Sequence, residues 1–160
     1  MREECPEIIY RRVTMGRGSS KAGGSGGDFS KSLVKDTLYH GTNAANITKF
    51  TTTGKESSGA IFFADDSDYA EEEAYIKDQN NGGGQYMYEV KVNIKNPMEV
   101  TLNDSDFADN RVEKKYIEQA KKQGYDSVIF KSNYGDEYLD QTFYAVFTPE
   151  QVKIINKKKI

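Results

Sequence analysis

The chain has 160 residues and a formal net charge of −3 at pH 7. This length fits one domain with a complete hydrophobic core, and the small net charge excludes a general attraction to nucleic acids or anionic membranes. No apolar run approaches the roughly 18 residues that cross a bilayer. The single cysteine, Cys5, excludes a disulfide framework or a cysteine metal cluster. We therefore expect a soluble, cytoplasmic protein with no membrane partner and no metal.

The N-terminal residues differ in composition from the rest of the chain. Residues 16–30 are rich in glycine and serine, which is typical of a flexible linker with too little apolar surface to fold. Residues 11–27 contain four basic side chains and no acidic one. We predict a flexible basic arm over residues 1–30, interpreted as a solvated tail, and one domain over residues 31–160.

Seven segments of this domain are predicted to form strands. In chain order they cover residues 35–40, 59–64, 86–94, 98–102, 126–130, 142–147 and 151–155. The clearest pattern runs from Tyr86 to Ile94, where every second residue is an apolar β-former. Such alternation is typical of a strand with one buried face.

Two helices are predicted between these strands. The first covers Asp68 to Lys77 and follows the capping cluster Asp65-Asp66-Ser67. The second covers Asp109 to Gln123, carries its apolar residues on one stripe and ends at Gly124. Two helices are too few for a doubly wound parallel sheet, so we predict an α+β fold.

The only histidine, His40, lies in the segment Leu38-Tyr39-His40-Gly41-Thr42. An apolar approach followed by a polar residue and a glycine is typical of a strand end that faces a ligand. Taken alone, the same pattern favours a structural histidine that caps a strand. Because there is no second histidine, any imidazole chemistry belongs to His40.

Further segments follow this one in a characteristic order. They are Gly59 to Asp65, Ser67 with the Ala74-Tyr75 pair, and the C-terminal stretches over residues 124–129 and 144–153. Together with residues 39–42, they resemble ADP-ribosyltransferases of the His-Tyr-Glu branch, which contains diphtheria toxin and the poly(ADP-ribose) polymerases, and most closely its small phage and bacterial domains. The resemblance implies a split antiparallel β-sheet core with a few flanking helices.

The resemblance also implies an activity. We expect a mono-ADP-ribosyltransferase that uses NAD as co-substrate, cleaves the nicotinamide–ribose bond and transfers ADP-ribose to a macromolecular acceptor, a protein rather than a nucleic acid. Such a chain would be a phage or bacterial effector, acting in the host cytoplasm if phage-encoded. One alternative is a catalytically silent domain that keeps the cleft for binding. Another is an NAD-dependent RNA 2′-phosphotransferase, which needs more basic residues than Lys49, Lys55 and Lys131 near the motifs.

The first motif supplies the residues expected to bind NAD, namely Tyr39, His40, Gly41 and Thr42. By resemblance, His40 hydrogen-bonds the adenosine ribose and orients NAD. Gly41 presents its backbone N–H and C=O to the nicotinamide amide, where a Cβ would be crowded. Thr42 adds a ribose or phosphate contact.

The second motif supplies an aromatic wall. Phe62 stands where many relatives carry a tyrosine beside the nicotinamide, and Ser67 is placed to reach the carboxamide. A second stacking tyrosine lies on the following helix in the family. Counting with the family's spacing leads to Glu73, between Tyr69 and Tyr75, and the preceding alanine favours Tyr75 over Tyr69.

The third motif departs from the family. A gapless match places Phe143 where relatives carry a glutamate that bonds the nicotinamide ribose and stabilises the developing cation. Phenylalanine can do neither. Glu137 and Asp140 in the preceding loop, or Gln141 on a bulged strand, are the candidates for this role.

Overall fold

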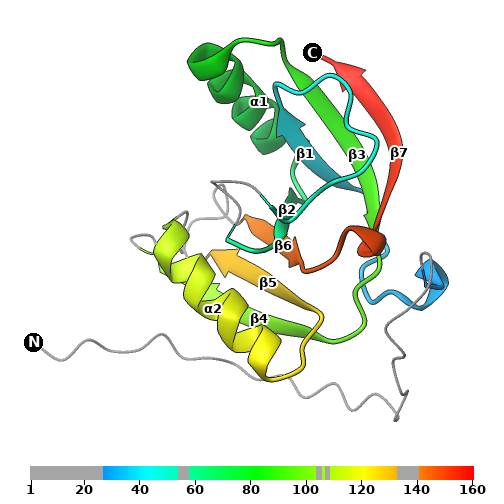
Figure 1. Cartoon of the computed structure of the whole chain (residues 1–160), viewed down its shortest axis with the longest axis vertical. Helices are drawn as coiled ribbons and strands as arrows, with labels where there is room; N and C mark the ends of the chain where they lie inside the picture. The colour runs from blue at the N-terminus through cyan, green and yellow to red at the C-terminus, as the bar shows by residue number, and fades with distance from the viewer. Residues whose placement is uncertain (1–26, 54–57, 104–105, 107–108, 133–140) are drawn as a thin grey trace, which may run out of the picture.

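The computed structural model describes residues 27–53, 58–103, 106, 109–132 and 141–160. The strands are β1 (Leu38–Thr42), β2 (Ile61–Ala64), β3 (Tyr86–Val92), β4 (Pro97–Leu102), β5 (Ser127–Ser132), β6 (Thr142–Val146) and β7 (Val152–Lys159). The helices are α1 (Ser67–Asn81) and α2 (Asn110–Lys122), with 3-10 turns η1 (Phe29–Lys31) and η2 (Pro149–Gln151) (Figure 1). All seven predicted strands and both predicted helices are present, with ends that shift by a few residues. Residues 1–26, most of the predicted arm, lie outside the described residues.

The strands form one sheet in the order β4-β5-β6-β2-β1-β3-β7. Neighbouring strands are antiparallel except β4 and β5, which are parallel. The predicted α+β class is therefore confirmed, and the sheet is mixed rather than wholly antiparallel. Among the described residues, no helix is both long and apolar enough to cross a membrane.

The sheet is split between its two central strands. β1 and β2 pair only at Tyr39 and Ala64, whereas β1 pairs with β3 over its whole length and β2 does the same with β6. The result is a β1 half (β1, β3 and β7) and a β2 half (β2, β6, β5 and β4), which separate beyond this single pair (Figure 1). The split is where a ligand can approach the backbone of both strands.

Helix α1 packs closely on the β1 half. It begins at the cap Asp66, whose side chain accepts a hydrogen bond from the Asp68 N–H. A Cβ at Gly41 would lie 1.6 Å from the carbonyl oxygen of Ala70 and 2.9 Å from the nitrogen of Ala74. The helix backbone therefore rests directly on β1, and only glycine fits at residue 41.

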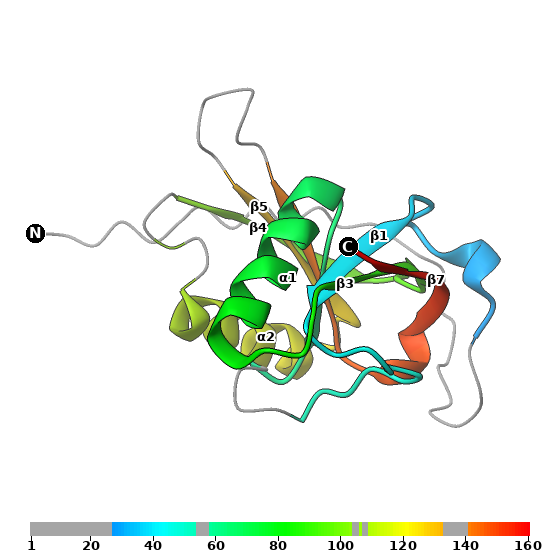
Figure 2. The same ribbon diagram turned by 90° about the horizontal axis from the view of Figure 1, so that it is seen from above.

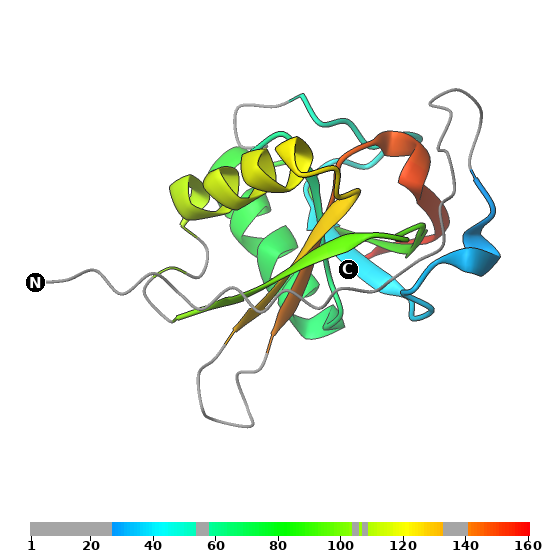
Figure 3. The same ribbon diagram turned by 90° about the horizontal axis from the view of Figure 1, so that it is seen from below.

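Helix α2 covers the β2 half on the same side of the sheet as α1 (Figures 2 and 3). Its predicted apolar stripe is confirmed, because Tyr116, Ile117 and Ala120 are buried against β4, β5 and β6. The cap is Asp109, which accepts from the Arg111 N–H. Both helices thus begin near the split and flank it.

Candidate active site

A cavity of about 600 Å³ lies at the split between β1 and β2. This volume is typical of sites that hold small molecules or cofactors. Its walls come from β1, β2, β6, the segment after β1, α1 and the start of α2. The polar side chains on these walls are Tyr39, His40, Lys49, Thr51, Tyr69, Glu73, Lys77, Asn110 and Glu113.

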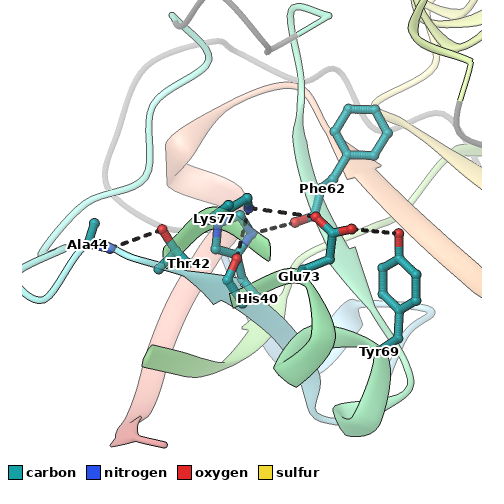
Figure 4. Close-up of polar contacts among 8 residues, drawn as sticks. His40, Thr42, Ala44, Phe62, Tyr69, Glu73 and Lys77 are labelled. Carbon is teal, nitrogen blue, oxygen red and sulfur yellow. Dashed lines mark hydrogen bonds and ion pairs between the residues drawn. The ribbon is translucent and has the colours of Figure 1, made fainter. Parts of the chain in front are cut away.

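The His40 ring bridges the two halves of the sheet. Its Nδ1 lies 2.9 Å from the carbonyl oxygen of Phe62 (Figure 4). Because a carbonyl can only accept, Nδ1 carries the proton and Nε2 keeps a lone pair. The rings of Phe50 and Phe63 hold the imidazole edge-on, with centroids 5.0 and 5.7 Å away.

The same surroundings keep this imidazole neutral. Burial and, to a smaller extent, the positive charge of Lys77 lower the pKa of His40 to about 4, while the bond to Phe62 opposes the shift. Among the described residues, Nε2 has no hydrogen-bond partner. His40 therefore offers a neutral hydrogen-bond acceptor to a ligand hydroxyl at physiological pH.

A line of polar contacts runs from β1 along α1. The Lys77 Nζ donates to the Gly41 carbonyl oxygen at 2.8 Å and lies 4.0 Å from the Glu73 carboxylate. The Tyr69 hydroxyl donates to the other side of this carboxylate at 3.1 Å (Figure 4). Burial and the charge of Glu73 raise the pKa of Tyr69, so its hydroxyl stays protonated. These contacts fix the positions of three side chains on one face of α1.

Aromatic rings from β2 and β6 also line the cavity. Phe143 pairs with Ala64 across β2 and β6, and its ring meets that of Tyr69 edge-to-face at 4.7 Å. Phe62, on β2, stacks on Phe130 with the two ring centroids 6.3 Å apart. The wall therefore presents π faces and edges to the cavity, as a flat aromatic ligand requires.

Glu113 brings a second carboxylate to the cavity from the first turn of α2. Burial raises its pKa to about 7, with contributions from the negative charges of Asp109 and Glu73. Among the described residues, the Glu113 carboxylate has neither a hydrogen-bond nor an ion-pair partner. Of the two carboxylates on the described part of the wall, Glu73 and Glu113, Glu113 is the one open to a ligand.

Several predicted site residues do come together. Tyr39, His40, Gly41, Phe62 and Tyr69 all line the cavity. The Gly41 carbonyl, expected to contact nicotinamide, already accepts from Lys77, and its missing Cβ makes room for α1. Glycine at this position is therefore explained by helix packing.

Other predicted residues lie elsewhere. Tyr75 is 53% exposed and does not line the cavity, because positions 69, 73 and 77 of α1 face it and a residue two places further points away. The geometry thus favours Tyr69 over Tyr75. Thr42 is buried and bonds the Ala44 N–H.

The remaining predicted residues do not line the cavity or lie outside the described residues. Ser67 begins α1 and does not line the cavity, and the backbone of Gln141 pairs with Ser132 instead. Glu137 and Asp140 lie outside the described residues.

Among the lining residues absent from the predicted site, Glu113 and Lys77 bear most on the chemistry. The sequence does mark Glu113 as a candidate functional residue, because it stands one turn before Tyr116 and Ile117 on the inward stripe of α2. A charge on an apolar stripe calls for a functional explanation. Lys77 shows no comparable signal, since its role depends on a contact with distant Gly41.

The fold and the cavity define an α+β domain with a small-molecule site in a split sheet. Residues 35–160 match the model of a family described as ADP-ribosyltransferase in polyvalent proteins. The chain therefore belongs to this ADP-ribosyltransferase family, as its motifs predict, and takes from it a general role in ADP-ribosyl transfer. Membership of the His-Tyr-Glu branch stays a prediction. No curated protein matches the chain, and no solved structure does.

Proposed function

We propose that the protein is a mono-ADP-ribosyltransferase that binds NAD in the cavity, cleaves the nicotinamide–ribose bond and transfers ADP-ribose to a protein. The observation that carries this proposal is His40, which lines the cavity of an ADP-ribosyltransferase-family chain with Nδ1 engaged by Phe62 and Nε2 without a partner among the described residues. A role as a phage or bacterial effector in a host cytoplasm rests on the resemblance of the motifs alone.

The lining residues fit the parts of NAD. The neutral acceptor of His40 suits a ribose hydroxyl, and the rings of Phe62 and Tyr69 suit the flat nicotinamide. Lys49 lies on the wall with an exposed side chain, and its partner among the described residues is Glu150, in a surface ion pair at 3.4 Å. Such a pair is weak, so Lys49 is available to a pyrophosphate.

The chemistry needs positioning more than covalent attack. Cleavage of a ribosyl bond passes through a transition state with positive charge on the sugar, which orientation and nearby negative charge stabilise. A group with a pKa of about 4 is a weak base at neutral pH, so His40 orients the sugar and does not remove a proton.

The two alternatives make different demands on the cavity. A silent domain is favoured by Phe143, which occupies the wall where the family's glutamate is expected. An RNA 2′-phosphotransferase needs several free cations, whereas the described part of the cavity wall holds Lys49 and the engaged Lys77. We therefore retain the silent domain as the competing hypothesis.

Incubation of the full chain with NAD labelled in the ADP-ribose part, in a bacterial lysate, tests the proposal. We expect release of nicotinamide and label on protein. His40→Asn should keep the bond to Phe62 through its amide N–H and lose NAD affinity at least about tenfold, because it lacks Nε2. NAD binding without nicotinamide release would establish the silent domain, and the absence of NAD binding would contradict both.

Tyr69→Ala and Tyr75→Ala form a matched pair for the same assay. Only the first should weaken NAD binding, because only Tyr69 lines the cavity. Equal losses in the two variants, at equal thermal stability, would contradict the placement of the nicotinamide.

A further inference from the structure

Two carboxylates, Glu73 and Glu113, line the described part of the cavity wall. A transition state with positive charge on ribose is stabilised by a carboxylate that is close, fixed in place and not already neutralised. Phe143, from β6, cannot supply this charge although it lies on the wall. The two glutamates therefore have to be compared.

Glu73 is already occupied on both sides. Lys77 lies 4.0 Å from one oxygen and offsets part of the charge, and the Tyr69 hydroxyl donates to the other oxygen at 3.1 Å. A ligand would have to displace one of these partners. Glu73 is thus suited to position Tyr69 and Lys77.

Glu113 is differently placed. It comes from the first turn of α2 and lines the same cavity as Phe143, and among the described residues its carboxylate has no partner to displace. The first turn of a helix favours a negative charge, which offsets part of the cost of burial. The charge of Glu113 acts on Tyr69, and Tyr69 contacts Phe143, so these three side chains share one region of the cavity.

We propose that Glu113 is the catalytic carboxylate, bonding the nicotinamide-ribose hydroxyl and stabilising the positive charge on that ribose in place of an acid at residue 143. This inference rests on the proposed function. In the step, the bond from ribose C1′ to the nicotinamide nitrogen breaks and its electron pair stays on that nitrogen, which becomes neutral. A new bond forms from C1′ to the acceptor atom of the target protein, and the acceptor's proton passes to water.

The supporting electrostatics agree with this assignment. The pKa of Glu113, raised to about 7 by burial and by Asp109 and Glu73, leaves about half of the carboxylate charged at pH 7, and the positive charge on the reacting ribose favours this charged form. Such values are common for carboxylates in active sites. A carboxylate with only a structural role in α2 would gain from an ion-pair partner, and none is present among the described residues.

Glu113→Gln tests the proposal, with Glu118→Gln as the matched control, since Glu118 is an exposed glutamate on the same helix. NAD affinity is measured by calorimetry, nicotinamide release by its rate, and folding by thermal unfolding. We expect E113Q to lower kcat at least about 100-fold while the Kd for NAD stays within about threefold, and E118Q to match wild type.

The outcomes separate the two proposals. A wild-type protein that binds no NAD or releases no nicotinamide would overturn the proposed function and this assignment together. An active wild type with an equally active E113Q would overturn only the role of Glu113. So would a comparable loss in E137Q or D140N alongside a normal E113Q.

The double variant E113Q/F143E gives an independent readout. If both positions reach the same ribose, a carboxylate at residue 143 should recover at least about tenfold of the lost rate, while a structural role of Glu113 predicts no recovery. A double variant as slow as E113Q would overturn the shared position.

Discussion

At the scale of single residues, Glu113 is a charged side chain at a position whose apolar surroundings favour an uncharged one. It shares the inward face of α2 with the buried Tyr116 and Ile117, where an apolar side chain would pack better. The folded pKa of about 7 exceeds the ordinary value of 4.5, so the folded chain holds a proton that the unfolded chain releases. Stability from this proton is present below about pH 4.5 and is lost as the pH rises through 7.

Glu113→Gln is therefore expected to stabilise the protein in a pH-dependent way. The free energy of unfolding should rise by about 1–2 kcal/mol at pH 8 and change little at pH 4.5, after a discount for partial exposure. Urea unfolding of variant and wild type at both pH values measures this, with Glu118→Gln as the control. Because His40 is common to both proteins, its own titration cancels. A variant less stable than wild type at pH 8 would contradict the burial of an unpaired carboxylate.

At the scale of elements, the contact between α1 and β1 positions the site. Tyr69, Glu73 and Lys77 project from one face of α1, and their distance from β1 is set by Gly41. The atom that a new Cβ would meet is a backbone oxygen of Ala70, so no side-chain change in α1 can make room.

Gly41→Ala should consequently push α1 away from β1 and lower the free energy of unfolding by at least about 3 kcal/mol. Chemical denaturation measures this loss. Gly124→Ala is the control, because a Cβ there meets nothing within 4 Å, and only the positive φ of 82° makes alanine cost about 1–2 kcal/mol. Equal stabilities of the two variants would show that α1 does not rest on Gly41. It follows that loss of activity in a Gly41 variant is no evidence for a contact with NAD.

The elements were predictable from the sequence because their signals are local. The alternation from Tyr86 to Ile94, and caps such as Asp66 and Asp109, act within a few residues of the structure that they define. Helical periodicity does not distinguish Tyr69 from Tyr75, because at 3.6 residues per turn the two lie equally far, on opposite sides, from the inward direction of the buried Ala70 and Ala74. Only the position of the cavity, which Tyr69 lines, separates them.

The site itself was less predictable because its contacts join distant segments. Lys77 donates a hydrogen bond to the carbonyl oxygen of the distant Gly41. Glu113 can meet a ligand only because β1, β2 and α1 supply the other walls of the cavity. The matched motifs place Phe143 on the cavity wall. These motifs do not indicate which other element carries a carboxylate on the cavity wall.

At the scale of the whole molecule, a split sheet needs other links between its halves. One is the bond from His40 to Phe62 at the split. Another is the side chain of Gln151, whose amide nitrogen donates to the Asn93 carbonyl after β3 and to the Asp126 carbonyl before β5, both at 3.1 Å. Its amide oxygen accepts from the backbone N–H groups of residues 147 and 148. One amide thus ties the β1 half to the β2 half, away from the cavity.

Gln151→Ala should therefore destabilise the whole domain. It leaves two carbonyls and two N–H groups without this partner, and at about 1 kcal/mol per lost bond the free energy of unfolding should fall by about 2–4 kcal/mol. Gln151→Glu, nearly the same in shape, should lose about as much, because a carboxylate repels the two carbonyls that the amide joins. Urea unfolding measures both, against Gln79→Ala on the exposed side of α1, which should stay within about 0.5 kcal/mol of wild type. A Gln151→Glu variant with wild-type stability would mean that the Gln151 amide does not hold the two halves together.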